Sequence, residues 1–180
     1  MKMSAKALKK ASLPEIKGKT LAVIGLGAIG RLVANAAVDL GMKVVGYDPF
    51  LSPAAAETLK KDVQIINSLD EIFPKADYVT VHVPLTPETK EMICAENIAK
   101  MKDTVRIINL ARGDLANSAD VVSALEDGRM AAYVTDFPSA DLIGVDGVIA
   151  MPHLGASTPE SEENCATMGA AEQIDYLENG

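Results

Sequence analysis

Cysteine is scarce in this chain of 180 residues, which contains Cys94 and Cys165 and no others. The two lie far apart in the sequence, and neither belongs to a CxxC pair. This pattern excludes a disulfide framework and a cysteine-based zinc site, and it is typical of free thiols in a reducing compartment. We therefore expect a cytoplasmic protein that binds no metal.

Long apolar runs and clusters of positive charge are also absent. No hydrophobic run approaches the roughly 20 residues of a membrane span, and the first residues lack the apolar core of a signal peptide. The formal net charge is −8, and the lysines of residues 2–10 are interspersed with apolar residues. Without a basic cluster to neutralise phosphates, neither nucleic acid nor an anionic membrane is an expected partner. A composition of 48% hydrophobic and 23% charged residues is typical of a soluble globular protein.

Three glycines separate an apolar segment from a periodic one. Residues 21–24 are an apolar run that predicts a buried parallel strand, and Gly25, Gly27 and Gly30 follow it in a GxGxxG pattern. Hydrophobic residues then recur with helical spacing at Ile29, Leu32, Val33, Ala36, Ala37 and Leu40. A second strand, expected at residues 42–47, ends at Asp48. Strand, glycine turn, helix, strand and acidic residue together predict a βαβ unit that binds a dinucleotide.

Each residue of this fingerprint has a separate expected role. Gly25 permits the tight turn, Gly27 lets the backbone approach a pyrophosphate, and Gly30 lets the helix pack closely on the strand. The N-terminus of the helix would face the phosphates. Asp48 would accept hydrogen bonds from the hydroxyls of an adenine ribose and repel a 2′-phosphate, which favours NAD over NADP. The alternative is a glycine-rich turn without a ligand.

The rest of the chain alternates strands with helices. Further strands are expected at residues 63–66, 78–83, 105–110, 130–135 and 147–151. Helices are expected at residues 54–60 and 95–101, from Ser68 to Pro74, from Asn117 to Gly128, and after Thr158. Ser68 and Glu71 have the spacing of a capping box, and Asn117 and Thr158 are expected N-caps. This alternation predicts a Rossmann-type α/β fold, doubly wound, with a mainly parallel sheet of seven strands and helices on both faces.

Polar side chains follow several of the expected strands, namely Asp48, His82, Arg112, Asp136 and His153. The carboxyl ends of parallel strands share one edge, so we expect the active site there. Arg112 is either a guanidinium that holds a carboxylate and polarises a carbonyl, or a surface residue paired with Asp114. His153 is either a group that exchanges protons or a structural histidine, and His82 lines a cofactor pocket at most.

Four motifs in this order resemble the signatures of the D-isomer-specific 2-hydroxyacid dehydrogenases. They lie at residues 25–31 with Asp48 and Pro49, at 81–89, at 109–114 and at 152–158. The last motif is most similar to the D-3-phosphoglycerate dehydrogenase branch, and the resemblance covers residues 17–178. It implies an oxidoreductase that transfers a hydride between NAD and a 2-hydroxy acid. In that branch the small-molecule substrate is the phosphorylated acid 3-phosphoglycerate, which is oxidised on the route to serine.

The resemblance also implies roles for single residues. Arg112 matches the arginine that binds the substrate carboxylate, and His153 matches the acid/base that takes up and returns the hydroxyl proton. The glutamate that partners this histidine in the family matches Asp141, which is one methylene shorter and either reaches His153 or is merely solvated. Asp136 matches an aspartate near the nicotinamide carboxamide. The implied cofactor-binding set is Gly25, Gly27, Ala28, Ile29, Gly30, Asp48, His82, Pro84, Thr89 and Asp136.

Ahead of the glycine fingerprint we expect no counterpart of the long segment that builds the family's substrate domain. We therefore expect residues 20–180 to be an NAD-binding domain with little or no turnover of its own, and residues 1–19 to be a truncated remnant that holds a helix (1–12) and a connector. The family also implies a homodimer through this domain. Two alternatives remain open: another D-2-hydroxyacid dehydrogenase, of glyoxylate or lactate type, or a non-enzymatic NAD-sensing interaction module.

Overall fold

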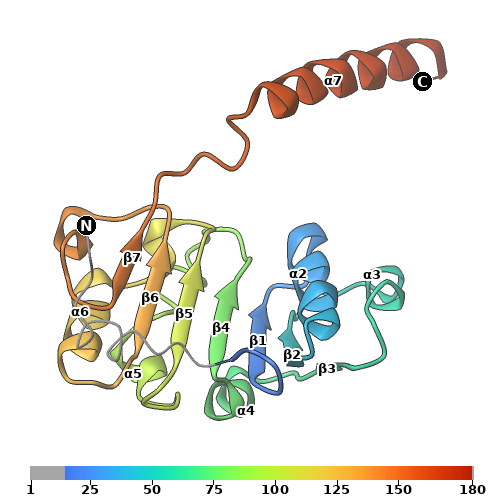
Figure 1. Ribbon diagram of the computed structural model, residues 1–180. Coiled ribbons are helices and arrows are strands. Elements are labelled where there is room, and N and C mark those ends of the chain that lie inside the picture. Colours follow the sequence, from blue (N-terminus) through green and yellow to red (C-terminus); the bar gives the residue numbers. More distant parts are fainter. Residues whose placement is uncertain (1–14, 180) are drawn as a thin grey trace.

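The computed structural model describes residues 15–179, so the helix expected at residues 1–12 lies outside the described residues. In the described chain, seven strands form one sheet, and every neighbouring pair of strands is parallel (Figure 1). The strands are β1 (Thr20–Ile24), β2 (Lys43–Tyr47), β3 (Val63–Ile65), β4 (Tyr78–Val81), β5 (Arg106–Asn109), β6 (Ala132–Thr135) and β7 (Val148–Ala150). The predicted number and direction of the strands are thus confirmed.

Helices and short 3₁₀ turns connect the strands. The α-helices are α2 (Ala28–Asp39), α3 (Pro53–Glu57), α4 (Leu69–Ile72), α5 (Ala95–Ile98), α6 (Ser118–Glu126) and α7 (Pro159–Asn179). The 3₁₀ turns are η1 (Phe73–Lys75), η2 (Gly113–Leu115) and η3 (Ala140–Leu142). All six α-helices overlap segments where the sequence predicts a helix, and each of α2 to α6 connects two parallel strands.

The order of the strands places a topological switch point at the middle of the sheet. The order is β3-β2-β1-β4-β5-β6-β7, so β1 lies between β2 and β4. The chain moves outward in one direction from β1 to β3 and in the other direction from β4 to β7. Ligands of doubly wound sheets bind outside the carboxyl ends of the strands at such a switch point. The segments that follow β1 and β4 therefore define where a ligand is expected.

Two hydrophobic cores cover opposite faces of the sheet. Leu21 and Val23 of β1 pack with the buried alanines of α2 on one face. Ala22 and Ile24 point to the other face, where their core includes buried residues of α4, α5 and α6. This alternation within one strand, with both sets buried, is typical of a parallel sheet covered on both sides. The expected helices on both faces are confirmed.

The helix caps follow the sequence in two cases and depart from it in a third. Asn117 accepts a hydrogen bond from the backbone N–H of Asp120 at 3.1 Å, and Thr158 accepts one from Ser161 at 3.1 Å. The predicted capping box at Ser68 is wrong, because the Ser68 side chain makes no capping hydrogen bond. The α4 helix has four residues and passes directly into η1, which contains Pro74, so the helix ends before the proline rather than at it.

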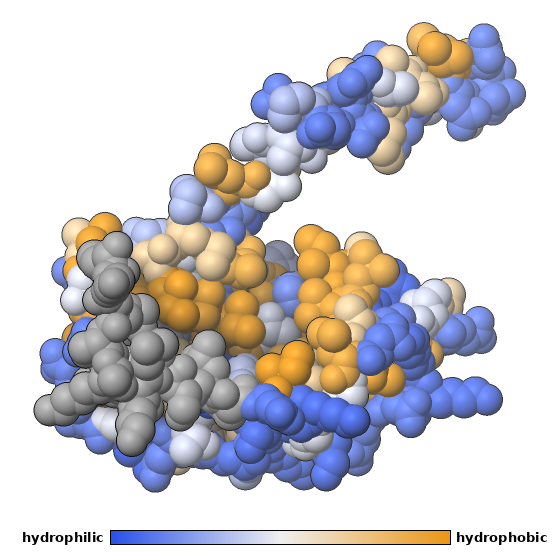
Figure 2. Space-filling view, viewed as in Figure 1, coloured by the Kyte–Doolittle hydropathy of each residue, from blue (hydrophilic) through white to orange (hydrophobic). Residues whose placement is uncertain are grey.

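The C-terminal helix α7 extends away from the sheet (Figure 1). None of its residues is buried, and its apolar residues Ile174 and Leu177 are exposed. Apolar side chains also gather over α2 on the face that Figure 2 shows. Leu32 of α2 and Leu40, which follows the helix, are exposed. Within residues 15–179, no helix combines the length and the hydropathy needed to cross a membrane.

Candidate active site

The glycine loop between β1 and α2 has the geometry that its sequence predicts. Gly25 has a φ angle of +93°, and a Cβ there would lie 2.7 Å from the carbonyl oxygen of His82. At Gly30, a Cβ would lie 1.9 Å from the carbonyl oxygen of Gly25, so only glycine lets α2 begin this close to the turn. At Gly27, by contrast, a Cβ would meet no atom within 4 Å. Gly27 thus borders open space, where a pyrophosphate can come close to the protein backbone.

The first turn of α2 is free to bind an anion. Gly27 is the N-cap and has no side chain that could accept hydrogen bonds from the backbone N–H groups of the turn. The turn contains no acidic residue. Ala28 and Ile29 follow at exposed positions, so the backbone N–H groups of this turn face the open side of the loop. Free N–H groups together with the positive end of the helix dipole suit a pyrophosphate.

Asp48 is tied to the glycine loop by its side chain. Its Oδ2 accepts a hydrogen bond from the backbone N–H of Leu26 at 2.8 Å, and its Oδ1 accepts one from Phe50 at 2.9 Å. Each carboxylate oxygen has a second lone pair, so the side chain retains acceptors for ribose hydroxyls. The contact with Leu26 is a loop-supporting role that sequence reasoning missed, because it joins two segments that are adjacent only in the folded sheet.

The loop after β4 holds itself together with its own polar groups. His82 Nε2 lies 3.0 Å from Thr80 Oγ1, and burial lowers the pKa of the His82 imidazole. Thr89 donates from its hydroxyl to the carbonyl oxygen of Pro84 at 2.6 Å and accepts from the backbone N–H of Thr86 at 2.8 Å. The three residues expected to line the cofactor pocket here, His82, Pro84 and Thr89, therefore belong to one braced loop beside the glycine turn.

Arg112 follows β5 on a turn that hydrogen bonds of the Asn109 side chain hold in place. The side chain of buried Asn109 donates to the backbone oxygen of Arg112 at 2.8 Å and to the Tyr133 hydroxyl at 3.1 Å, and it accepts from the N–H of Ala111 at 3.2 Å. Burial raises the pKa of Tyr133, so its hydroxyl stays protonated within this network. Sequence reasoning missed Asn109 and Tyr133, although a polar residue at the end of an apolar strand is a signal for such a role.

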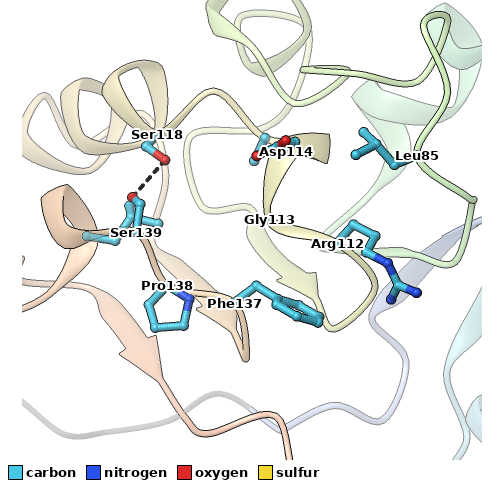
Figure 3. A pocket seen from close by; sticks show the side chains of 10 residues that line it. Leu85, Arg112, Gly113, Asp114, Ser118, Phe137, Pro138 and Ser139 are labelled. Carbon is cyan, nitrogen blue, oxygen red and sulfur yellow. Dashed lines mark hydrogen bonds between the residues drawn. The ribbon is translucent and has the colours of Figure 1, made fainter.

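The guanidinium of Arg112 is exposed beside a pocket. Its Nη1 donates to the carbonyl oxygen of Ala111 at 2.7 Å, and its Cζ lies 5.7 Å from the centroid of the Phe137 ring. In the described part of the chain it forms no ion pair with Asp114, so the surface-pairing alternative does not apply. The pocket has a volume of about 400 Å³, and Figure 3 shows Leu85 and Arg112 at one side of it and Ser118 and Ser139 at the other.

His153 lies just beyond β7 and is paired with the aspartate just beyond β6. Its Nδ1 lies 2.6 Å from Oδ2 of Asp136, and the side chains are 51% and 12% exposed respectively. The other oxygen of Asp136, Oδ1, is buried and has no hydrogen-bond partner. The His153 ring also packs on Phe137, with the ring centroids 4.2 Å apart. The structure thus brings both His153 and Arg112 against the same aromatic ring.

Asp141 does not reach His153. It lies in the first turn of η3 and is exposed, and the hydrogen bond of His153 is made to Asp136. Of the two alternatives that the sequence left for Asp141, the structure therefore shows the solvated one. The physical reason is the path of the chain, since Leu142 anchors η3 in the core while the 136–137 segment turns beneath His153.

The residues present fit a dinucleotide. The open side of Gly27 and the uncapped turn of α2 suit the pyrophosphate, Asp48 suits the ribose, and the unpaired Oδ1 of Asp136 offers an acceptor at the far end of the same edge. Within residues 15–179, no group of three or more His, Cys, Asp or Glu side chains could hold a metal ion. These features define a dinucleotide-binding α/β domain with an arginine and a histidine at its ligand edge.

Comparison with known proteins places this domain in a family. The family described as D-isomer specific 2-hydroxyacid dehydrogenase, NAD binding domain, matches residues 2–155, and the chain belongs to it. The D-3-phosphoglycerate dehydrogenase of Methanocaldococcus jannaschii is 41% identical over 172 residues, which are 92% of this chain and 32% of that protein. That of Synechocystis is 42% identical over 166 residues, or 89% of this chain and 29% of that protein. The chain thus spans about a third of the length of these relatives.

Solved structures with the same fold include complexes with the cofactor. The D-isomer specific 2-hydroxyacid dehydrogenase of Lactobacillus delbrueckii ssp. bulgaricus, in its NAD-complexed form, matches with a TM-score of 0.84 and 26% identity, covering 96% of this chain and 56% of that one. The D-lactate dehydrogenase of Lactobacillus jensenii with NAD⁺ matches with a TM-score of 0.80 and 29% identity, covering 91% of this chain and 54% of that one. The chain is therefore an NAD-binding domain of this family.

Proposed function

We propose that this domain serves hydride transfer between NAD and 3-phosphoglycerate. The observation that carries the proposal is the placement of Arg112 and His153, which lie 41 positions apart in the sequence and contact the same Phe137 ring at the ligand edge. The names of the relatives from Methanocaldococcus jannaschii and Synechocystis support the phosphorylated substrate.

Each side chain has one task in the proposed reaction. The Arg112 guanidinium holds the substrate carboxylate through two parallel hydrogen bonds, and its charge polarises the adjacent carbonyl. His153 accepts the hydroxyl proton during oxidation and returns it during reduction. NAD, when bound, supplies the acceptor for the hydride. Asp48 and the glycine loop fix the adenosine end of the cofactor, so that its reactive end reaches Arg112 and His153.

The test is a chimaera in which this chain replaces the matching segment of the Methanocaldococcus jannaschii relative, with that relative as the control. We expect NADH formation from 3-phosphoglycerate, and little from D-lactate. We expect His153→Gln to lower kcat by about 10²–10⁴-fold, the usual contribution of a general acid or base. We expect Arg112→Lys to raise KM for the substrate, because lysine cannot form the bidentate pair. A folded chimaera that binds NAD but oxidises no hydroxy acid would favour the NAD-sensing alternative.

A homodimer through this domain in the cytoplasm completes the proposal. The exposed Leu32 on α2 and Leu40 at its C-cap support self-association, because exposed apolar patches mark interaction surfaces. The free thiols of Cys94 and Cys165 support a reducing compartment. Sedimentation at micromolar concentration should give the mass of a dimer, and Leu32→Glu should give a monomer that still binds NAD. A monomer mass for the unmodified chain would contradict the proposed dimer, but not the proposed reaction.

A further inference from the structure

The pairing of His153 with Asp136 fixes where the proton of the imidazole lies. A carboxylate has only acceptors, so at 2.6 Å from Asp136 Oδ2 the Nδ1 atom of His153 must be the donor. When the ring is neutral, its proton is therefore on Nδ1 and the lone pair is on Nε2. An imidazole in this tautomer can accept a proton at Nε2 without rearranging.

The orientation of the ring is fixed by its second neighbour. Phe137 follows Asp136 directly, and its ring packs on the imidazole at a centroid distance of 4.2 Å and an interplanar angle of 35°. The backbone of Phe137 is held in turn, because its N–H donates to Thr135 Oγ1 at 3.1 Å and Thr135 is fully buried. Asp136 and Phe137 thus hold His153 by a hydrogen bond at one edge and by packing on one face.

The sheet register explains why these residues meet. Thr135 of β6 pairs with Ala150 of β7, and the N–H of Met151 donates to the oxygen of Thr135 at 3.0 Å. The next residues on both strands leave the sheet at the same edge, so Asp136 and His153 are brought together by rigid elements. Asp141 is carried away in η3, five positions further along.

We propose that Asp136 is the positioning residue of His153 and takes the place that the family resemblance gives to Asp141. The inference rests on the proposed function for its consequence in catalysis. In oxidation the hydroxyl proton moves to Nε2 of His153, and the hydride moves with its two electrons to NAD, which leaves a carbonyl on the substrate. The ring then carries a positive charge, and the Asp136 carboxylate compensates it through the Nδ1–H bond.

The first test needs neither substrate nor cofactor. Long-range ¹H–¹⁵N spectra of the chain distinguish imidazole tautomers, and His82→Gln assigns the signals, because His82 and His153 are the two histidines. We expect His153 in the Nδ1–H tautomer in the unmodified chain. In Asp136→Asn the Nδ1–H population should fall, because an amide can also donate to Nδ1. Asp141→Asn and Asp146→Asn, which change exposed carboxylates of the segment between β6 and β7, should leave the tautomer as it is.

A second test uses the chimaera and separates positioning from binding. We expect Asp136→Asn to lower kcat by about 10²–10⁴-fold, while KM for 3-phosphoglycerate changes little, and Asp136→Glu to restore part of the rate. Unfolding midpoints show whether each variant is folded. The inference is overturned if His153 is in the Nε2–H tautomer, or if Asp141→Asn shifts the tautomer and Asp136→Asn does not. If the tautomer shifts as expected but the chimaera has no activity, the proposed function fails and the pairing stands.

Discussion

The carboxylate of Asp48 accepts a hydrogen bond from the backbone N–H of Leu26, with an O–N distance of 2.8 Å across the gap between β2 and the glycine loop. Leu26 is 1% exposed, so water cannot easily replace this acceptor. The residue expected to recognise the ribose is therefore also part of the support of the loop that receives the pyrophosphate. Binding and stability are coupled at this position.

We predict that Asp48→Ala lowers the free energy of unfolding by about 1–3 kcal/mol, because it leaves the buried N–H of Leu26 without a partner. Asp48→Asn should cost less, since an amide oxygen can still accept from one of the two N–H groups. Urea unfolding followed by circular dichroism measures both values. Equal stability of the unmodified chain and Asp48→Ala would mean that the contact with Leu26 contributes nothing.

Gly27 and Gly30 should respond differently to the same substitution. At Gly27 the φ angle is −64° and a Cβ meets nothing within 4 Å, so Gly27→Ala should change stability by no more than about 1 kcal/mol. Its methyl group would fill the space beside the pyrophosphate, and we expect NAD affinity to fall at least about tenfold. At Gly30 the Cβ would lie 1.9 Å from backbone, so Gly30→Ala should cost about 3 kcal/mol or more.

Both outcomes can be measured by chemical unfolding and calorimetric titration on the same samples. If Gly27→Ala binds NAD as tightly as the unmodified chain, the cofactor does not approach the backbone at Gly27. If Gly30→Ala is as stable as Gly27→Ala, the close contact between the helix and the turn is not needed.

The fold could be predicted from the sequence because its signals are local. The apolar run at residues 21–24, the glycine spacing and the periodicity of α2 each fall within one segment, and the β-α alternation from β1 to β6 leaves a parallel sheet as the natural topology. The cap at Asn117 was predicted for the same reason. The cap at Ser68 failed because α4 is only one turn long and is set by the burial of Ile72 and Phe73 rather than by its N-terminus.

The sequence named residues that the structure brings close together, and their roles in binding and catalysis stay predictions. Arg112 and His153 were recognised from motifs, and the structure places them around Phe137. The partner of His153 depends on which residues leave β6 and β7 at the same height, and this register cannot be read from one segment alone. The same holds for Asn109 and Tyr133, whose hydrogen bond joins two neighbouring strands.

Two of the three expected N-caps, Asn117 and Ser68, offer a matched pair of variants. Asn117 accepts a hydrogen bond from the N–H of Asp120, so Asn117→Ala should lower the free energy of unfolding by about 0.5–2 kcal/mol. The side chain of Ser68 makes no such bond, and Ser68→Ala should change stability by less than about 0.5 kcal/mol. Thermal and urea unfolding of the two variants would test this. A larger loss of unfolding free energy for Ser68→Ala would mean that Ser68 caps α4 after all.

The stability of the domain should fall as the solution becomes mildly acidic, in part because of His82. Burial lowers the pKa of this imidazole in the folded state from its ordinary value of 6.5, so the unfolded state binds the proton first. The His82 contribution is fully present above pH 6.5 and is lost as the pH falls through the folded pKa. We predict that His82→Gln loses less stability than the unmodified chain between pH values above and below 6.5. Parallel slopes in the two proteins would exclude this contribution.

The most direct test of the account is a calorimetric titration of this chain with NAD and, separately, with NADP. Binding through the glycine loop, with Asp48 at the ribose, predicts that one NAD binds per chain and that NADP binds at least about tenfold more weakly, because its 2′-phosphate would lie against the Asp48 carboxylate. Asp48→Asn should narrow this difference. Equal affinity for the two cofactors, or no binding of either, would contradict the assignment of this edge of the sheet as the NAD site.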